Sequence, residues 1–297
     1  MLKRSKDSMK IYFRDLHADD IPTIKEISKD IWEGDDYVPN IIARWLQDDD
    51  CLNYGGFANN EMTEMIGFGR VKFFPNGIAW LEGGRVKSSE QKKGIGRELM
   101  QYAIDYARDH GSKYAQYDTA SENEGSIALA RYFGFKRKKA MECVVCETKN
   151  LKILDEEISP LEITQLNAEK AKEEYKNFDI GPGNEINIGW SYIPSEYIKD
   201  QGSLWFTYKD AILQKRGFPS HEIGESPGLD EIWLITYGNP INCSFLIKNV
   251  ILSELQGKSV KYFAVFCNPD VVEIIKDYGF SYWENKTIRV VLFEKEL

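Results

Sequence analysis

The residues best suited to chemistry form a short basic loop with two glycines, Gln91-Lys92-Lys93-Gly94-Ile95-Gly96-Arg97. An apolar strand pattern at 78–86 precedes this Q-x-x-G-x-G loop, and an amphipathic helix pattern follows it. The glycines let the backbone approach a ligand closely, and the first N–H groups of a helix have no partner within the helix. These groups, the helix dipole and the basic side chains favour an anion. The arrangement predicts a diphosphate-binding turn.

The spacing of this loop differs from that of two other phosphate-binding loops. The sequence has no G-x-x-x-x-G-K-[ST] of a P-loop and no G-x-G-x-x-G of a Rossmann turn, which implies a different nucleotide ligand. The alternative is that the glycines only end a strand and start a helix for packing reasons. Because strand, spacing and helix occur together, we favour ligand binding.

Glu82 is the candidate for acid–base chemistry in the strand before the loop. A charged residue inside an apolar strand is unfavourable unless it has a partner or a task. Its carboxylate is suited to accept a proton from an amine, directly or through a water molecule. The alternative is a structural carboxylate that pairs with a nearby arginine or faces water.

Hydrophobic periodicity predicts the elements that position this loop. Residues 10–16 alternate in polarity like a strand, and isoleucines at helical spacing predict a helix over 21–31. The further predicted elements are a short helix from 40, strands at 53–58, 65–74 and 78–86, a helix at 95–110, a strand at 114–118, a helix at 126–135 and a final strand. The predicted order is β-α-α-β-β-β-α-β-α-β, an α/β domain that ends near residue 148.

The remaining chain looks like a second copy of this domain. Residues 161–178 and 277–295 repeat the patterns of the first strand and helix and of the last helix and strand, and Gly279 lies 145 positions after Gly134. The charged segment 148–160 ends in a proline and predicts a linker. The domains expected are therefore 1–150 and 151–297. The second lacks a Q-x-x-G-x-G loop, so we expect it to be degenerate and to help wall the acceptor pocket.

Composition limits the partners and the location. The net charge is −9 and the basic residues gather on no extended face, which argues against nucleic acid. No apolar run reaches the length of a membrane span, and the charged N-terminus has no signal-peptide pattern, so a cytoplasmic protein with no membrane partner is expected. Cys143 and Cys146 have metal-ligand spacing, but residues three apart in a strand face opposite sides, and no metal is predicted.

Further residues follow the loop in a characteristic order. They are the strand at 114–118, Asn123 and a helix that ends in Tyr132-Phe133-Gly134-Phe135. Together with the Q-x-x-G-x-G loop after Val86, this order resembles the GNAT acyltransferase superfamily. The resemblance implies an α/β fold with a mixed central sheet flanked by helices, here as two tandem GNAT-like domains. It also implies acyl transfer with acetyl-CoA as the co-substrate.

The resemblance also implies roles for individual residues. The strand before the loop splays from the strand at 114–118, and the backbone at Arg85, Val86 and Lys87 holds the pantetheine arm in the gap. Residues Gln91–Arg97 hold the diphosphate. Asn123 bonds the arm, although helix capping is an alternative. Tyr132 is the general acid for the thiolate, and a packing tyrosine is the alternative.

Two blocks, 31–50 and 81–86, resemble the histidine N-acetyltransferase family of vertebrates and its wider relatives. This resemblance implies acetyl transfer to the primary amine of a small amino-acid-like acceptor, histidine among the candidates. Trp32, Asp35, Asp36 and Tyr37 are expected on the acceptor side, where carboxylates meet an ammonium and rings meet a side chain. The alternative is a solvated acidic turn with both rings in the core.

The residues alone do not select histidine over another amino acid, a polyamine or a peptide N-terminus. Two other functions therefore stay open beside the small-molecule transferase: a peptide or protein N-acetyltransferase, and a non-catalytic module that senses acetyl-CoA.

Overall fold

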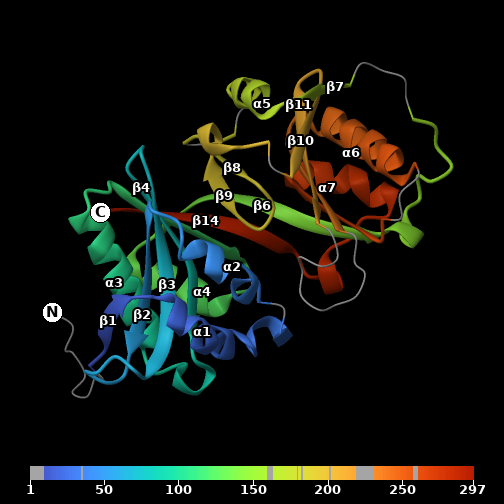
Figure 1. Ribbon diagram of the computed structural model, residues 1–297. Coiled ribbons are helices and arrows are strands. Elements are labelled where there is room, and N and C mark those ends of the chain that lie inside the picture. Colours follow the sequence, from blue (N-terminus) through green and yellow to red (C-terminus); the bar gives the residue numbers. More distant parts are fainter. Residues whose placement is uncertain are drawn as a thin grey trace. The chain divides into compact units, whose positions relative to one another are not determined.

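The computed structural model describes residues 10–34, 36–158, 163–178, 180–181, 183–200, 202–218, 231–256 and 260–297. Contacts divide the chain into two compact units (Figure 1). The first comprises Met1–Tyr117, Gly125–Lys136 and Phe293–Leu297, and the second comprises Asp118–Glu124 and Arg137–Leu292. The units therefore interleave along the chain and do not meet at a single boundary near residue 150.

The first half of the chain forms the elements in the predicted order. They are β1 (Tyr12–Asp15), α1 (Ile21–Ser28), α2 (Val38–Trp45), β2 (Cys51–Phe57), β3 (Met65–Phe74), β4 (Ile78–Val86), α3 (Ile95–Asp109), β5 (Tyr114–Ala120), α4 (Glu124–Phe133) and β6 (Lys136–Glu147). Pro22 and Pro39 stand in the first turns of α1 and α2, where a missing N–H is tolerated. The order β-α-α-β-β-β-α-β-α-β is confirmed.

The sheet of the first unit lies between two groups of helices (Figure 1). Strands β1 to β4 pair antiparallel in chain order, and β4 pairs parallel to β5. Side chains of α1 and α2, among them Ile24 and Trp45, form one core with Phe57 and Phe68. Helix α3 packs on β3 and β4, and Tyr54 donates a hydrogen bond of 3.0 Å to the Leu99 carbonyl of α3. The glycine loop thus begins a helix fixed firmly on its own sheet.

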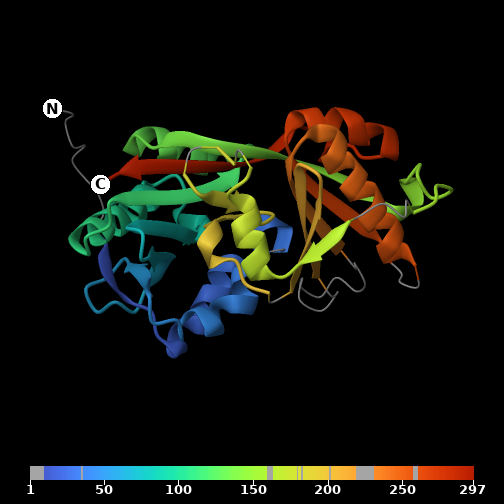
Figure 2. The same ribbon diagram turned by 90° about the horizontal axis from the view of Figure 1, so that it is seen from above.

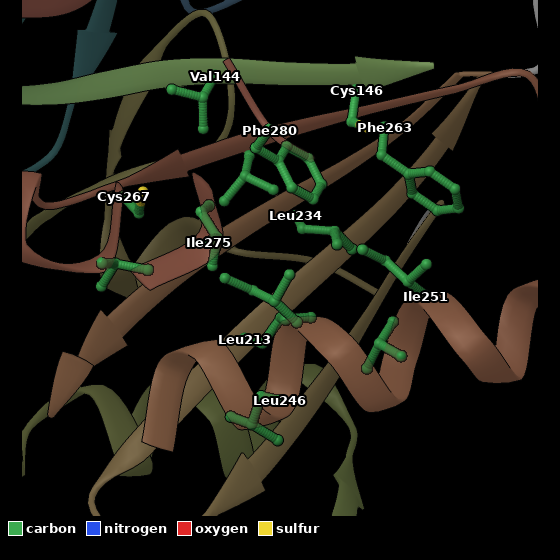
Figure 3. Packing of buried hydrophobic residues seen from close by; sticks show 14 of the residues in the cluster. Val144, Cys146, Leu213, Leu234, Leu246, Ile251, Phe263, Cys267, Ile275 and Phe280 are labelled. Atoms are coloured by element: carbon green, nitrogen blue, oxygen red, sulfur yellow. The ribbon is translucent and has the colours of Figure 1, made fainter. Parts of the chain in front are cut away.

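The second half repeats this order, with a short hairpin where the first half has α2. Its elements are β7 (Thr164–Leu166), α5 (Ala168–Tyr175), β8 (Glu185–Asn187), β9 (Tyr192–Pro194), β10 (Ser203–Tyr208), β11 (Ala211–Phe218), β12 (Glu231–Gly238), α6 (Pro240–Leu255), β13 (Tyr262–Cys267), α7 (Pro269–Ile275) and β14 (Ile288–Glu296). Helices α6 and α7 pack together in this unit (Figure 2). Leu246 and Ile251 of α6 meet Leu213, Leu234 and Phe263 of the strands in its core (Figure 3).

The last strand of each half completes the sheet of the other unit. In the first unit the end of β14, from Phe293 on, adds to the sheet beside β5, and Gln116 donates a hydrogen bond of 2.6 Å to Glu294. In the second unit β6 pairs antiparallel with β13, with Cys146 opposite Phe263. The sequence repeat predicts two domains, but it does not predict this exchange of strands.

The segment predicted as a linker is part of the second unit's core. Leu151 and Ile153 are buried there, at 6% and 1% exposure, beside Val144 and Cys146 of β6. Hydrophobic burial of these two side chains outweighs the charged composition that suggested a linker.

No helix in the described residues is long and apolar enough to cross a membrane. Within the same residues, no group of three His, Cys, Asp or Glu side chains is arranged to hold a metal ion. The cysteines are unpaired thiols. Cys146 belongs to the hydrophobic core that includes α6, and Cys143 does not. Strand residues three apart face opposite sides of the sheet, so this difference is expected.

Candidate active site

Strand β4 separates from β5 halfway along its length. The parallel pairing runs from Ile78 to Trp80, which lies opposite Gln116, and β4 then continues to Val86. Arg70 pairs with Glu82 but Phe68 pairs with Arg85, so two residues of β4 lie opposite one residue of β3. Such a bulge bends the strand. The gap that the resemblance implies between these strands is therefore present beyond Trp80.

Gly83 and Gly84 form the bulge, and the local geometry requires a glycine at Gly83. Gly83 has φ +65°, and a Cβ atom at this position would lie 2.6 Å from the Trp45 ring. A Cβ atom at Gly84 would meet no other atom within 4 Å. Gly83 therefore permits close packing with Trp45, whereas Gly84 is exposed and has open space around its Cβ position.

The backbone amides at the end of β4 differ in whether they are engaged by β3. The N–H of Lys87 donates a hydrogen bond of 2.9 Å to the Ile66 carbonyl of β3. Backbone groups of successive strand residues point to opposite sides, so the N–H of Val86 points away from β3. Lys87 was predicted to hold the pantetheine arm, but its amide is already engaged. Val86 is the residue of the three whose amide suits that role.

The glycine loop presents an open helix N-terminus. Gly94 is the N-cap of α3 with φ +92°, and no side chain caps the helix. The first donors within the helix are the N–H groups of Arg97 and Glu98, which bond to the Gly94 carbonyl at 2.9 and 3.3 Å. A side chain at Gly94 would meet no atom within 4 Å. The earlier amides thus stand at an exposed, unobstructed helix end, as an anion site requires.

The loop contacts β4 and α4 through its second glycine. A Cβ atom at Gly96 would lie 3.9 Å from Val86 and 3.8 Å from Leu129 of α4. Ile95 is buried at 2% exposure and anchors the first turn of α3 in the core. Gln91 donates a long hydrogen bond of 3.4 Å to the Val86 carbonyl. The predicted loop residues and the end of β4 are therefore brought together.

The basic side chains of the loop have different environments. Lys93 forms an ion pair of 3.1 Å with Glu90, the residue just before the loop, so part of its charge is balanced locally. Lys92 is exposed and adopts a left-handed φ of +62°. The Arg97 guanidinium lies over the ring of Tyr132 at 4.4 Å from the centroid. Tyr132 itself is 60% exposed on α4.

Glu82 is held by a buried arginine. The side chain of Arg70 is 2% exposed and donates from Nε to Glu82 at 2.8 Å, while the Glu82 side chain remains 25% exposed. The guanidinium also donates to the Asp48 carboxylate, the Asn53 side-chain oxygen and the Trp45 carbonyl, and it lies 4.9 Å from the Trp45 ring centroid. Burial raises the pKa of the Glu82 carboxyl above its ordinary value, and Arg70 opposes this rise. Glu82 is thus an arginine-paired carboxylate whose pKa is raised by burial.

Asp36 has a partner other than the one predicted. Arg85 donates to its two oxygens, at 2.8 Å each, and Asp36 also accepts from the Val38 N–H at 3.1 Å. Asp36 is 4% exposed. The carboxylate that was expected to meet an acceptor's ammonium therefore neutralises Arg85.

The two rings of the predicted acceptor segment are at the surface. Trp32 and Tyr37 are 54% and 42% exposed and stack at 6.1 Å, with the Arg85 guanidinium over both rings at 4.6 and 5.4 Å. Tyr37 also meets Trp45 edge-on at 6.1 Å. Both rings are therefore outside the core. Asp35 lies outside the described residues.

Asn123 is exposed and immediately precedes α4. Its backbone N–H donates a hydrogen bond of 3.0 Å to the Ala120 carbonyl. Its predicted bond to the coenzyme arm stays a prediction.

Arg70 and its partners other than Glu82, namely Trp45, Asp48 and Asn53, were not among the predicted site residues. The sequence shows Arg70 inside the apolar run 65–74, where a charged residue also calls for a partner. A charged residue inside an apolar strand is the same pattern that identified Glu82. Arg70 and Glu82 lie directly opposite each other in the β3–β4 register, so each is the partner that the other's position called for.

Comparison with known proteins agrees with this geometry. Residues 17–135 match the model of the acetyltransferase (GNAT) family. The fold is that of the GNAT acetyltransferases. Proteins of this fold use acetyl-CoA as their co-substrate, which agrees with the open helix end at Gly94.

Several solved structures match over both units, and two of them illustrate the likeness. A tandem GNAT protein from the clavulanic acid biosynthesis pathway is 11% identical with a TM-score of 0.63, and the match covers 97% of this chain and 98% of that chain. A GCN5-related N-acetyltransferase from Sphaerobacter thermophilus is 15% identical with a TM-score of 0.61, over 96% and 95% of the two chains. The tandem GNAT layout is thus confirmed for the fold.

Proposed function

We propose that this protein is an N-acetyltransferase that moves an acetyl group from acetyl-CoA to the primary amine of a small amino-acid-like acceptor. One observation carries the proposal. Glu82, with its pKa raised by burial, stands at the bulge where β4 has left β5. A carboxylate of raised pKa in such a gap suits a general base for an amine.

The residues around the gap fit acetyl-CoA. The uncapped N-terminus of α3 and the open space at Gly94 suit the diphosphate, with Lys92 and Arg97 as the cations beside it. The Val86 amide suits the pantetheine arm, which pairs with exposed backbone as an added strand does. Acetyl-CoA supplies an activated acetyl thioester.

Side chains of this protein are proposed to take the proton from the amine and to supply a proton to the thiolate. An α-amine with pKa about 8 is mostly protonated at neutral pH and must lose a proton before it can attack. Glu82 accepts this proton, and Arg70 fixes the orientation of the carboxylate. Tyr132 is proposed to donate a proton to the leaving thiolate through its hydroxyl.

The acceptor side offers aromatic surface beside Glu82. Trp32 and Tyr37 are exposed, and Tyr37 contacts Trp45, which in turn packs against Gly83. These rings suit a small planar or apolar side chain, and histidine is one such acceptor. The ammonium of the acceptor is assigned to Glu82, because Asp36 is already paired with Arg85.

We propose further that the second unit is a degenerate copy with no coenzyme site. Asn239 caps α6 by accepting hydrogen bonds from the N–H groups of Ile241 and Asn242 at 3.0 and 3.3 Å. Strands β12 and β13 also stay paired over five positions, from Glu231 to Ile235. The helix end and the strand gap that suit a coenzyme in the first unit are thus filled in the second.

Titration of the full chain with acetyl-CoA is expected to give one binding site per chain. Thiol release is then followed with free amino acids, polyamines and peptides as acceptors. Release with free amino acids alone supports the proposal, and release with peptides alone favours the peptide N-acetyltransferase. Binding without release for any amine favours a sensing module, and two sites per chain would contradict the degenerate second unit.

A further inference from the structure

The ring of Tyr132 contacts the glycine loop, although the role proposed for Tyr132 concerns only its hydroxyl. The Arg97 guanidinium lies 4.4 Å from the ring centroid. One turn earlier on α4, Leu129 packs 3.8 Å from the Cβ position of Gly96. The first turn of α3 and the last turns of α4 therefore meet along two successive residues of the loop.

This contact leaves the binding edge of Arg97 available. A guanidinium stacks on an aromatic ring through its face, whereas it bonds phosphate oxygens through the N–H groups at its edge. Within the described part of the chain, no carboxylate or carbonyl is bonded to the Arg97 side chain. Stacking therefore restricts the guanidinium plane without using its hydrogen-bond donors.

The donors of Arg97 remain available, whereas Lys93, the other loop cation with a defined contact, uses its ammonium in an ion pair. The side chain of Lys93 is 55% exposed and pairs with Glu90, the residue just before the loop. A flexible side chain loses more rotamer freedom on binding than one already held in place. Arg97 is the loop cation whose orientation is set in advance by an aromatic ring.

We infer that Tyr132 is a positioning residue for the coenzyme: its ring holds the Arg97 guanidinium so that the edge faces the diphosphate at the start of α3. This inference rests on the proposed function, because it assumes that the loop binds a coenzyme. The role belongs to the ring and is separate from any proton transfer by the hydroxyl. Phe in place of Tyr132 keeps the ring, and Leu removes it.

Calorimetric titration with CoA tests the inference without any acceptor. Tyr132→Phe is expected to keep the wild-type Kd, and Tyr132→Leu is expected to raise Kd about two- to fivefold, the size of an exposed cation–π contact. Arg97→Gln is expected to raise Kd at least as much. In the Arg97→Gln background, Tyr132→Leu is expected to have no further effect, because the pair acts as a unit. Arg131→Gln removes a neighbouring exposed cation of α4 as the control for net charge.

Each other outcome counts against the inference. An unchanged Kd for Tyr132→Leu, or additive effects of the two substitutions, would overturn it. An Arg97→Gln effect that vanishes with 3′-dephospho-CoA would place Arg97 on the 3′-phosphate and overturn the diphosphate assignment. Thermal unfolding checks that the Leu variant is folded, and Tyr132→Trp, which restores a ring, is expected to restore Kd. If the wild-type protein binds no CoA, the proposed function fails. If the wild-type protein binds CoA and Tyr132→Leu has the same Kd, only the role of the Tyr132 ring is lost.

Discussion

Replacing Glu82 by Gln is expected to lower kcat/KM for acetyl transfer by about 100- to 10,000-fold, the usual contribution of a general base. Gln keeps the shape of the side chain and still accepts a hydrogen bond from Arg70, but it takes no proton from the acceptor. Steady-state rates with the acceptor found by thiol release measure the loss. Coenzyme affinity by calorimetry is expected to stay unchanged, because the glycine loop is intact.

The pH dependence of this loss has a defined sign. Glu82 is active as the carboxylate, so the wild-type rate rises with pH through its pKa, which burial places above the ordinary carboxyl value. In Glu82→Gln this rise is absent, and the rate follows only the deprotonated fraction of the amine, whose pKa is about 8. The deficit is therefore expected to be largest near neutral pH and to shrink as the amine loses its own proton.

Asp48→Asn is the matched control for this experiment. Asp48 is the other carboxylate on Arg70, with its side chain 46% exposed, so its loss disturbs the arginine without touching the proposed base. A small effect in Asp48→Asn beside a large one in Glu82→Gln supports the base. Equal losses in the two variants would show that Glu82 acts only through Arg70.

Replacing Arg70 by Met is expected to lower the free energy of unfolding by about 3–5 kcal/mol. Removing one partner of a buried ion pair leaves the other charge desolvated and unpaired, and that loss is typically of this size. Here the Glu82 carboxylate loses its partner, and the Trp45 carbonyl and Asn53 oxygen lose a donor. Urea unfolding followed by tryptophan fluorescence measures the change.

The Arg70→Met loss is expected to grow as the pH rises. Burial already raises the folded-state pKa of Glu82 above the ordinary 4.5, and Arg70 opposes this rise. Removing Arg70 is therefore expected to raise the folded-state pKa of Glu82 further. A carboxyl group with a raised folded-state pKa favours folding at low pH, and this contribution is lost as the pH rises through that pKa. Unfolding at pH 5 is therefore expected to show a smaller loss than at pH 8.

Arg108→Met is the control, because Arg108 pairs with Asp105 at the surface, with about half of each side chain exposed. Exposed pairs of this kind contribute at most about 1 kcal/mol. Equal losses at the two arginines would contradict the special role of the buried site.

The sequence by itself determined the elements of the first half and the position of the glycine loop. Periods of apolar residues, the prolines at helix starts and the glycines at Gly94 and Gly96 act over a few neighbouring positions. Such signals do not depend on the rest of the chain. Glu82 was found in the same way, because a carboxylate inside an apolar strand is unusual whatever its partner is.

Only the tertiary structure decided which groups meet across the chain. Arg70 reaches Glu82 and Arg85 reaches Asp36 because of the strand register, the bulge at Gly83 and the return of α2 onto the sheet. The exchange of β6 and β14 between the units, and the burial of Leu151 and Ile153, follow likewise from long-range pairing. A repeat in the sequence gives each half a similar last strand, but it does not say which sheet that strand joins. Which sheet each strand joins depends on packing between residues more than a hundred positions apart, and local periodicity carries no information about that choice.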